Sequence, residues 1–188
     1  MTELNTVREF MTAAHFDLPK VQEMLTQNPD LLNVEYDWGP GGWETPIQAG
    51  AHMGDRPITE YLLAQGAPMI ICAAAMLGRA DEVKRLLEAN PADANARGGH
   101  GIPVMFHAAM SGKVEIAQLL KDNGCMEGYD DAIHGAVAFG HSDMVKWLLD
   151  NGANNVNALD FRGKTPLAVA EEKGFPAIAE LLRENGAA

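Results

Sequence analysis

Hydrophobic residues in this chain gather in pairs of helical segments. A first segment of small and apolar residues, such as Met105 to Ser111, precedes a second one in which apolar residues recur at i, i+3 and i+4, such as Ile116 to Leu120. That period places the apolar residues on one face of a helix. A glycine closes the first segment at residues 54, 78, 112, 140 and 174, and Asp17 holds the same place near the N-terminus. The pattern predicts six units, each a helix, a turn and a helix.

The predicted helix ends carry their own signals. Thr45-Pro46 and Thr165-Pro166 place a hydroxyl at the N-cap and a proline at the first helical position, where its missing N–H is no loss. Glycines at 66, 124, 152 and 186 fall 12 positions after an aligned glycine, where a left-handed residue would end the second helix. Capping and periodicity therefore indicate the same helix boundaries.

These segments are similar to a known family. Asp160 to Ala168 (DFRGKTPLA), Asp131 to His134 (DAIH) and Leu148 to Ala153 (LLDNGA) resemble the ankyrin repeat, and such matches recur in phase from about residue 5 to residue 187. The resemblance implies an all-α, ankyrin-repeat solenoid of stacked helix-turn-helix pairs with short β-hairpin fingers. We expect one domain over 1–188, with units at about 5–35, 36–67, 68–96, 97–125, 126–158 and 159–188.

The spacing of the units is irregular. Intervals between the aligned positions run 37, 24, 34, 28 and 34 residues, around the family's usual value of about 33. The short units lose residues before their first helix, where a finger should be. We therefore expect full fingers only at 37–44, 97–102 and 160–164, with gaps in the row of fingers at the third and fifth units.

The resemblance also implies where a partner would bind. In proteins that look like this, the last positions of each first helix line the concave surface, and in this chain they are largely aromatic, Met or His. Adaptable Met side chains beside aromatic ones are typical of protein-binding surfaces. The alternative is that these residues pack onto neighbouring helices as core. With the finger residues added, the expected partner-binding residues are Phe16, Trp38, Trp43, His52, Met53, Met76, Leu77, His100, His107, Met110 and Phe139.

The two finger tryptophans leave two interpretations open. Trp38 and Trp43 flank a glycine-rich turn that can bend sharply. One ring could close over the gap left by the missing third finger. Alternatively, at least one ring packs on the base of its own hairpin.

Composition narrows the range of partners. The formal net charge of -12 disfavours nucleic acids and anionic membranes, since binding to either depends on Lys and Arg neutralising phosphates. Cys72 and Cys125 are too few and too isolated for a disulfide framework. The chain has no signal-peptide pattern and no long apolar run. We expect a cytoplasmic protein, and its polar ends favour a monomer.

Catalytic and metal chemistry find little support in the sequence. Gly163-Lys164-Thr165 lacks the leading glycine of a phosphate-binding loop, and Ser111 and Ser142 do not lie in a nucleophile turn. His15 and His52 hold equivalent places in adjacent units, which predicts a separation of roughly 8 to 10 Å. A zinc site needs three or four ligands, and no third candidate has a fixed spacing. We therefore expect no enzyme, no cofactor and no metal.

Three functions remain open. The first and favoured one is a protein–protein interaction scaffold that binds a protein or peptide through the concave groove and the fingers. The second is a small-ligand or metal-responsive binding protein that uses the Trp38 and Trp43 finger and the groove histidines. The third, a hydrolase-like activity between the fingers, has no positive sign in the sequence.

Overall fold

The computed structural model describes residues 3–188, and in them twelve α-helices follow one another as six pairs. The first three pairs are α1 (Glu3–Ala13) with α2 (Leu18–Gln27), α3 (Pro46–Met53) with α4 (Arg56–Ala64), and α5 (Ile71–Met76) with α6 (Ala80–Ala89). The last three are α7 (Val104–Ser111) with α8 (Val114–Asp122), α9 (Tyr129–Ala138) with α10 (Ser142–Asn151), and α11 (Pro166–Glu172) with α12 (Pro176–Glu184). The 3-10 turns are η1 (Pro29–Asn33), η2 (Pro91–Asn95) and η3 (Gly99–Gly101), and the strands are β1 (Tyr36–Asp37) and β2 (Trp43–Glu44).

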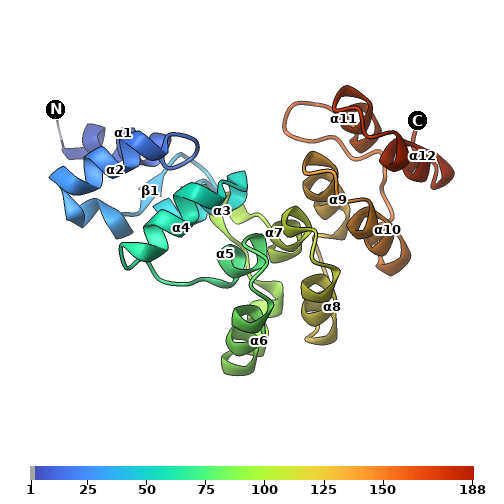
Figure 1. Cartoon of the computed structure of the whole chain (residues 1–188), viewed down its shortest axis with the longest axis horizontal. Helices are drawn as coiled ribbons and strands as arrows, with labels where there is room; N and C mark the ends of the chain where they lie inside the picture. Colours follow the sequence, from blue (N-terminus) through green and yellow to red (C-terminus); the bar gives the residue numbers. More distant parts are fainter. Residues whose placement is uncertain (1–2) are drawn as a thin grey trace.

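The helix pairs stack side by side along an arc, with the two chain ends at opposite ends of it (Figure 1). Helices α5, α7 and α9 pack in sequence on one another, and α6, α8 and α10 line the outer side. The expected all-α solenoid of helix pairs is confirmed. Helix α9 approaches α7 closely because residue 135 is glycine: a Cβ there would lie 3.0 Å from the carbonyl oxygen of Phe106.

The predicted helix ends are found in the structure. Asp17 and Asp55 accept hydrogen bonds from the amides of Lys20 and Ile58, at 3.0 and 2.9 Å, and so cap α2 and α4. The five aligned glycines all adopt the left-handed conformation, with φ between 70° and 75°. This conformation ends each first helix and turns the chain into the second one.

The fingers differ from one another more than the sequence indicates. The first is a hairpin in which Tyr36 pairs with Glu44 and Asp37 with Trp43. The second has a single bridge between Arg97 and Pro103, because its glycine-rich tip folds into η3 instead of extending as a strand. In the third, residues 160–164 form a tight turn around the side chain of Asp160, which accepts the amides of residues 162 and 164. The connections before α5 and α9 are short, as expected for the two gaps.

Four residues expected on the concave surface are buried, and for them the expectation of an exposed track is wrong. Met76, Leu77 and Met110 belong to an apolar core that extends from the first helix pair to α7, where small residues such as Ala49 and Ala73 bring the inner helices close together. The ring of His107 is fully buried under the second finger, against Gly98. The packed-core alternative therefore applies to these four side chains. None of the helices in residues 3–188 is long and apolar enough to cross a membrane.

Candidate functional site

Seven of the predicted partner-binding residues keep surface exposure. Phe16 is 68% exposed and Trp43 59% exposed, and Met53 and Phe139 are 46% and 44% exposed. Trp38 and His100 are exposed to a smaller degree, and His52 lies between buried and exposed. Phe16, Met53 and Phe139 each directly precede an aligned position, so they occupy equivalent sites on the stack. We call these three residues the apolar track.

The bend of the stack brings Phe139 of the apolar track to the helix that carries Met53. A Cβ built on Gly54, at the end of α3, would lie 2.4 Å from the ring of Phe139, at the end of α9. Aligned glycines elsewhere meet the next unit instead: Gly112 meets His141 and Gly140 meets Phe175. Phe139 therefore reaches past two intervening helix pairs to the unit that carries Met53.

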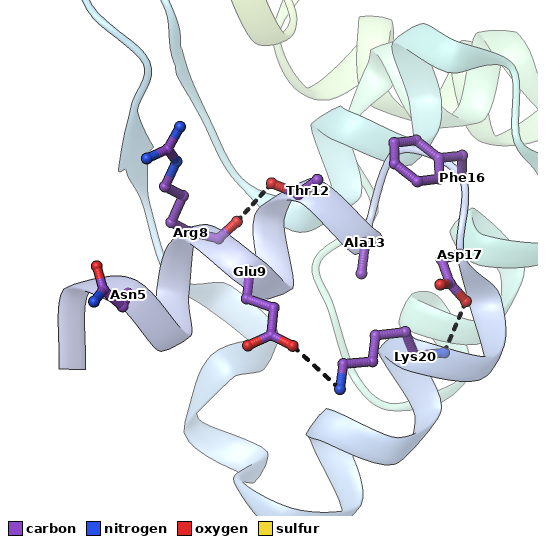
Figure 2. A pocket seen from close by; sticks show the side chains of 8 residues that line it. All are labelled: Asn5, Arg8, Glu9, Thr12, Ala13, Phe16, Asp17 and Lys20. Carbon is purple, nitrogen blue, oxygen red and sulfur yellow. Dashed lines mark hydrogen bonds and ion pairs between the residues drawn. The ribbon is translucent and has the colours of Figure 1, made fainter. Parts of the chain in front are cut away.

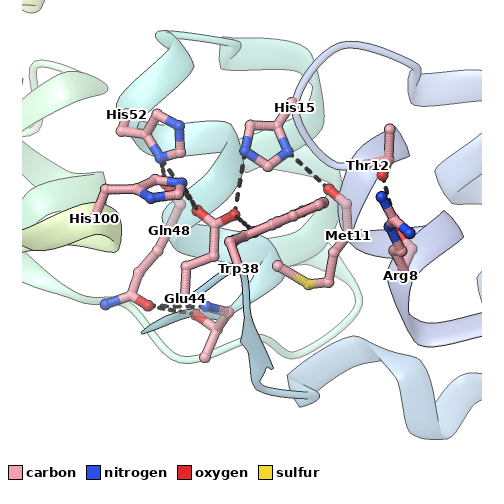
Figure 3. A network of polar contacts seen from close by, with 10 residues as sticks. Arg8, Met11, Thr12, His15, Trp38, Glu44, Gln48, His52 and His100 are labelled. Atoms are coloured by element: carbon pink, nitrogen blue, oxygen red, sulfur yellow. Dashed lines mark hydrogen bonds and ion pairs between the residues drawn. The ribbon is translucent and has the colours of Figure 1, made fainter. Parts of the chain in front are cut away.

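A second group of side chains gathers at the base of the first finger. It consists of His15 after α1, Glu44 in β2, His52 in α3 and His100 in η3, and we call it the histidine–glutamate cluster (Figure 3). One ligand-type atom from each residue lies within 4.8 Å of the others. The carboxylate of Glu44 is the centre of the group, and its side chain has no exposed surface.

The two carboxylate oxygens of Glu44 lie near different imidazoles. Oε1 of Glu44 lies 3.2 Å from Nε2 of His15 and accepts a hydrogen bond from Nε1 of Trp38 at 2.5 Å. Oε2 lies 3.4 Å from Nδ1 of His52 and 3.5 Å from Nε2 of His100, and it is buried with no hydrogen-bond partner in residues 3–188. The imidazole rings of His15 and His52 are in edge contact, with centroids 5.0 Å apart.

Backbone carbonyls hold two of these rings. Nδ1 of His15 donates to the carbonyl of Met11 at 2.8 Å, and Nδ1 of His52 lies 3.1 Å from the carbonyl of Gln48 (Figure 3). Both carbonyls are four residues earlier on the same stretch of helix. A bond of this kind fixes the orientation of an imidazole and leaves its other nitrogen for a second partner. In His15 that second nitrogen faces Glu44.

Burial and nearby charged groups shift the pKa values of these side chains in opposite directions. Desolvation lowers the pKa of His52 to about 4, more than the nearby Glu44 carboxylate raises it, so this imidazole is neutral at pH 7. For His15, desolvation is the largest single effect, but the hydrogen bonds to Glu44 and Met11 and the charge of Glu44 together outweigh it, and the pKa is raised. For Glu44, desolvation is again the largest single effect, but the contacts with His15, His52 and Trp38 together outweigh it, and the pKa is lowered. The carboxylate is therefore ionised in spite of its burial.

The sequence analysis missed this cluster for two reasons. The expected separation of His15 and His52 at 8 to 10 Å is wrong, since that range describes helix axes and the two rings lean toward each other across the gap. The premise that no third ligand exists is also wrong, because Glu44 and His100 complete the set. In the sequence Glu44 is the last residue of a finger, directly before Thr45-Pro46, and nothing at that position indicates its burial.

Trp38 packs on its own hairpin, as in the second of the two interpretations left open by the sequence. Its ring packs at the base of its own hairpin, in edge contact with Tyr36 and His15, with centroids 4.7 and 5.9 Å away. Its indole N–H is committed to Glu44. Trp43 points outward and is more than half exposed. The two tryptophans therefore have different environments, and Trp38 is part of the support around the histidine–glutamate cluster.

The gap in the row of fingers at the fifth unit opens a pocket. A cavity of about 330 Å³ lies between the second and third fingers, over α7 and α9. Its apolar lining includes Phe106, Leu159 and Phe161, and its polar lining includes Arg97 and His134. Leu159 and Phe161 are strongly exposed at its rim. The expected gap is therefore a hollow with an apolar rim.

A wider hollow of about 530 Å³ runs along α1 and the start of α2 (Figure 2). The polar groups that line it bond mainly to one another: Lys20 pairs with Glu9 at 3.2 Å, and the hydroxyl of Thr12 donates to the carbonyl of Arg8. Phe16 lies at its edge. These contacts stabilise the first helix pair, and they do not point to a ligand for this hollow.

One family profile and two known proteins are similar in sequence to this chain. The family profile described as ankyrin repeats (3 copies) matches residues 70–156 and 126–188. An ankyrin repeat-containing protein of Schizosaccharomyces pombe is 36% identical over 75 residues, which is 37% of this chain and 36% of that protein. A Medicago truncatula protein named Vapyrin-like is 28% identical over 113 residues, or 58% of this chain and 24% of that protein. The chain thus spans about a third and about a quarter of the lengths of these two relatives.

Proposed function

Because the chain belongs to the ankyrin repeat family, we propose that it is a protein–protein interaction scaffold that binds a protein or peptide partner through the concave side of the stack and the fingers. Ankyrin repeats generally mediate protein–protein interactions. A preformed, rigid surface of this kind lowers the ordering cost of binding. Burial of the core within and between helix pairs, with residues such as Ile58 and Leu120 fully covered, supplies that rigidity.

The exposed apolar track carries this proposal. Large hydrophobic side chains that stay exposed at equivalent places on a stack are costly in water, and contiguous patches of them generally mark interaction sites. Phe16, Met53 and Phe139 meet this description, and Trp43 extends the surface onto the first finger. Since Met76, Leu77 and Met110 are buried, the surface is narrower than the sequence indicates.

The proposed partner is an apolar segment flanked by basic residues. Aromatic and Met side chains provide anchoring pockets and contact area for Leu- or Phe-like groups. The net charge of -12 favours approach of a cationic chain and disfavours an acidic one. Both features are expected in one peptide, with the apolar residues on the track and the Lys or Arg residues around its rim.

Peptide display against the purified chain tests this function. We expect selected peptides to carry apolar anchors with basic flanks, and to lose at least about tenfold in affinity on a Phe16→Ser, Met53→Ser double variant, which removes roughly 1.4 kcal/mol or more of binding free energy. Leu4→Ser is the matched control, because Leu4 is also strongly exposed on α1 but lies outside the track. Peptides that bind wild type and double variant equally, with the helical content unchanged, would contradict the proposal.

As part of the same proposal, the chain acts as a monomeric cytoplasmic binding protein rather than an enzyme. Cys72 and Cys125 are both free, buried thiols, which suits a reducing compartment. The hydroxyl of Ser111 is used in the turn after α7, where it donates to the carbonyl of Ala108 and accepts the amide of Lys113. That use is structural and leaves the hydroxyl without a neighbouring base.

A further inference from the structure

We propose that the histidine–glutamate cluster is a binding site for a divalent transition-metal ion, Zn²⁺ in the first instance, with His15, Glu44, His52 and His100 as its ligands. The proposal concerns a site separate from the apolar track and does not depend on the scaffold function. It rests on the kind of side chains present, on their separations, on an unpartnered buried oxygen and on the way the surrounding chain is built.

The donor set is suited to zinc. Three imidazoles and one carboxylate supply four nitrogen and oxygen ligands. Sites of histidine and carboxylate are typical of Zn²⁺, whereas Mg²⁺ and Ca²⁺ prefer sets made of oxygen alone. A buried carboxylate also provides a negative charge that lowers the cost of placing a dication among neutral rings.

The separations between the imidazole nitrogens and Glu44 are compatible with ligands that share one ion. With metal–ligand bonds of about 2.0 to 2.1 Å, ligands at the corners of a tetrahedron lie about 3.3 Å apart. Nε2 of His15 lies 3.2 Å from Oε1 of Glu44, and Nδ1 of His52 and Nε2 of His100 lie 3.4 and 3.5 Å from Oε2. These values are long for hydrogen bonds to a carboxylate, for which about 2.7 to 2.9 Å is usual. They are close to the separation that ligands have around one ion.

The Oε2 atom of Glu44 is the strongest sign of a missing partner. The side chain is fully buried, yet this oxygen accepts no hydrogen bond among the described residues. An unpaired buried carboxylate oxygen is costly, and native proteins satisfy nearly all such atoms. The two nitrogens nearest to it belong to His52 and His100. An ion held between these three groups would satisfy the oxygen.

The Met11 carbonyl and the Trp38 indole hold two of the proposed ligands in the way that an outer ligand shell does. The bond from Nδ1 of His15 to the Met11 carbonyl leaves Nε2 as the metal-binding atom, and the indole of Trp38 orients Glu44 through Oε1. Metal-binding histidines commonly donate their other N–H to a backbone carbonyl in this way. Binding through Nδ1 of His52 places that ring's proton on Nε2, so its contact with Gln48 is exchanged for the metal bond.

The second finger is bent to bring its histidine to the site. His100 is the one non-glycine residue with positive φ in residues 3–188, at 55°. Residues other than glycine seldom adopt this conformation, and those that do are often found at functional sites. The neighbouring residue must be glycine, because a Cβ on Gly99 would lie 2.8 Å from Oε2 of Glu44 and 3.2 Å from Nδ1 of His52. Both features keep the backbone of η3 directly against the cluster.

One ion at this position would join elements that are distant in the sequence. His15 belongs to the first helix pair, Glu44 and His52 to the second, and His100 to the finger before the fourth. With four protein ligands the site is closed, which is typical of structural zinc. The expected role is therefore to fix the two fingers and the first two helix pairs in one arrangement.

Metal titration of the full chain tests the proposal. After removal of metal with a chelator, calorimetry with ZnCl₂ at pH 7 should give one ion per chain, and Mg²⁺ and Ca²⁺ should give no saturable heat. Co²⁺ should produce the visible absorption of a tetrahedral complex. Zinc at about 100 times its Kd should raise the Tm by roughly 5 to 10 °C.

Four variants separate ligand loss from loss of fold. Glu44→Gln and His52→Gln keep the side-chain shape and should lower zinc affinity by at least about 100-fold, beyond what loss of an outer-shell group costs. His100→Gly relieves the positive φ, so the metal-free chain should be at least as stable as wild type while zinc binding weakens. His134→Ala is the control, since His134 bonds to the Ala158 carbonyl outside the cluster, and its zinc affinity should equal that of wild type.

Two results would overturn the proposal. One is a wild-type chain that shows no saturable zinc binding and no rise in Tm. The other is zinc binding of the same strength in wild type, Glu44→Gln and His100→Gly, which would place the ion at other residues, such as the two cysteines. In either case the cluster would be a polar network that holds the first finger without metal.

Discussion

At the scale of single residues, two kinds of position are the most sensitive to change: a glycine with no room for a side chain, and a polar side chain that is completely buried. Gly54 is one example, because the ring of Phe139 occupies the place of a Cβ and the backbone φ is 70°. His107 is another, because its ring is completely buried and, within the described part of the chain, only Nδ1 has a hydrogen-bond partner, the carbonyl of Pro103 at 3.0 Å. Each of the two leads to a measurable consequence.

Gly54→Ala should lower the free energy of unfolding by about 2 to 3 kcal/mol, from the strained φ and from displacement of Phe139. Gly174→Ala is the matched control, since Gly174 has φ 71° but no atom within 4 Å of the built Cβ. The control should lose only about 1 kcal/mol. Chemical denaturation measures both values, and equal losses would show that Phe139 does not rest on Gly54.

The buried imidazole of His107 should make stability depend on pH. Desolvation lowers its pKa to about 4, below the ordinary value of 6.5 that applies in the unfolded chain. Between these values the unfolded state binds more protons, so the stabilisation is complete above pH 6.5 and is lost as the pH falls toward 4. The full effect is about 3 kcal/mol.

The comparison of wild type with His107→Met isolates this contribution. Denaturation midpoints measured from pH 7 to pH 4 should fall more steeply for wild type, because the variant has no proton to bind at that position. The imidazoles of the histidine–glutamate cluster are present in both proteins and cancel in the difference, apart from the smaller effect that the charge of His107 has on the pKa of His52. Parallel pH profiles would contradict the assignment of a neutral, buried His107.

At the scale of elements, the helix pairs follow from the sequence and the fingers do not. The period of apolar residues, the Thr-Pro starts and the aligned glycines are local signals, and the helices begin and end close to them. The conformation of 97–103 depends instead on what it packs against: β2 and α3, about 50 residues earlier in the chain. For the same reason Glu44 could not be recognised as a cluster residue, since its burial is produced by η3 and by the Trp38 ring.

The missing finger before α5 has a compensating contact that the sequence pattern did not indicate. The guanidinium of Arg56, at the start of α4, donates to the carbonyls of Met76 and Leu77 at 3.1 and 2.7 Å. These carbonyls belong to the last turn of α5, which is only six residues long. The planar fork of arginine reaches both oxygens, whereas a lysine ammonium would reach one.

Arg56→Lys should therefore destabilise the chain by about 1 to 3 kcal/mol, the range for loss of a hydrogen bond to a charged group in a part-buried place. Arg85→Lys is the control, because Arg85 pairs only with the exposed Glu82 three residues earlier on the same helix. Its effect should stay within about 0.5 kcal/mol. Thermal unfolding of the two variants distinguishes the roles, and equal Tm values would contradict a capping role for Arg56.

At the scale of the whole molecule, the stack brings together residues that no local pattern connects. Phe139 meets Gly54 across two helix pairs, and the histidine–glutamate cluster unites segments near residues 15, 44, 52 and 100. A solenoid is usually stabilised by contacts between neighbouring units alone. Contacts of longer range here join the first helix pairs to the second finger and to α9, and so hold the apolar track and the histidine–glutamate cluster on a fixed frame.

Amide hydrogen exchange of the full chain with and without Zn²⁺ tests this most directly. Zinc should slow exchange together at 10–16, 36–53 and 97–103, which carry the proposed ligands, and leave α11 and α12 unchanged. Simultaneous protection of these three distant segments, abolished in Glu44→Gln, is the result the account predicts. Exchange that zinc leaves unchanged, or slows in one segment alone, would contradict it.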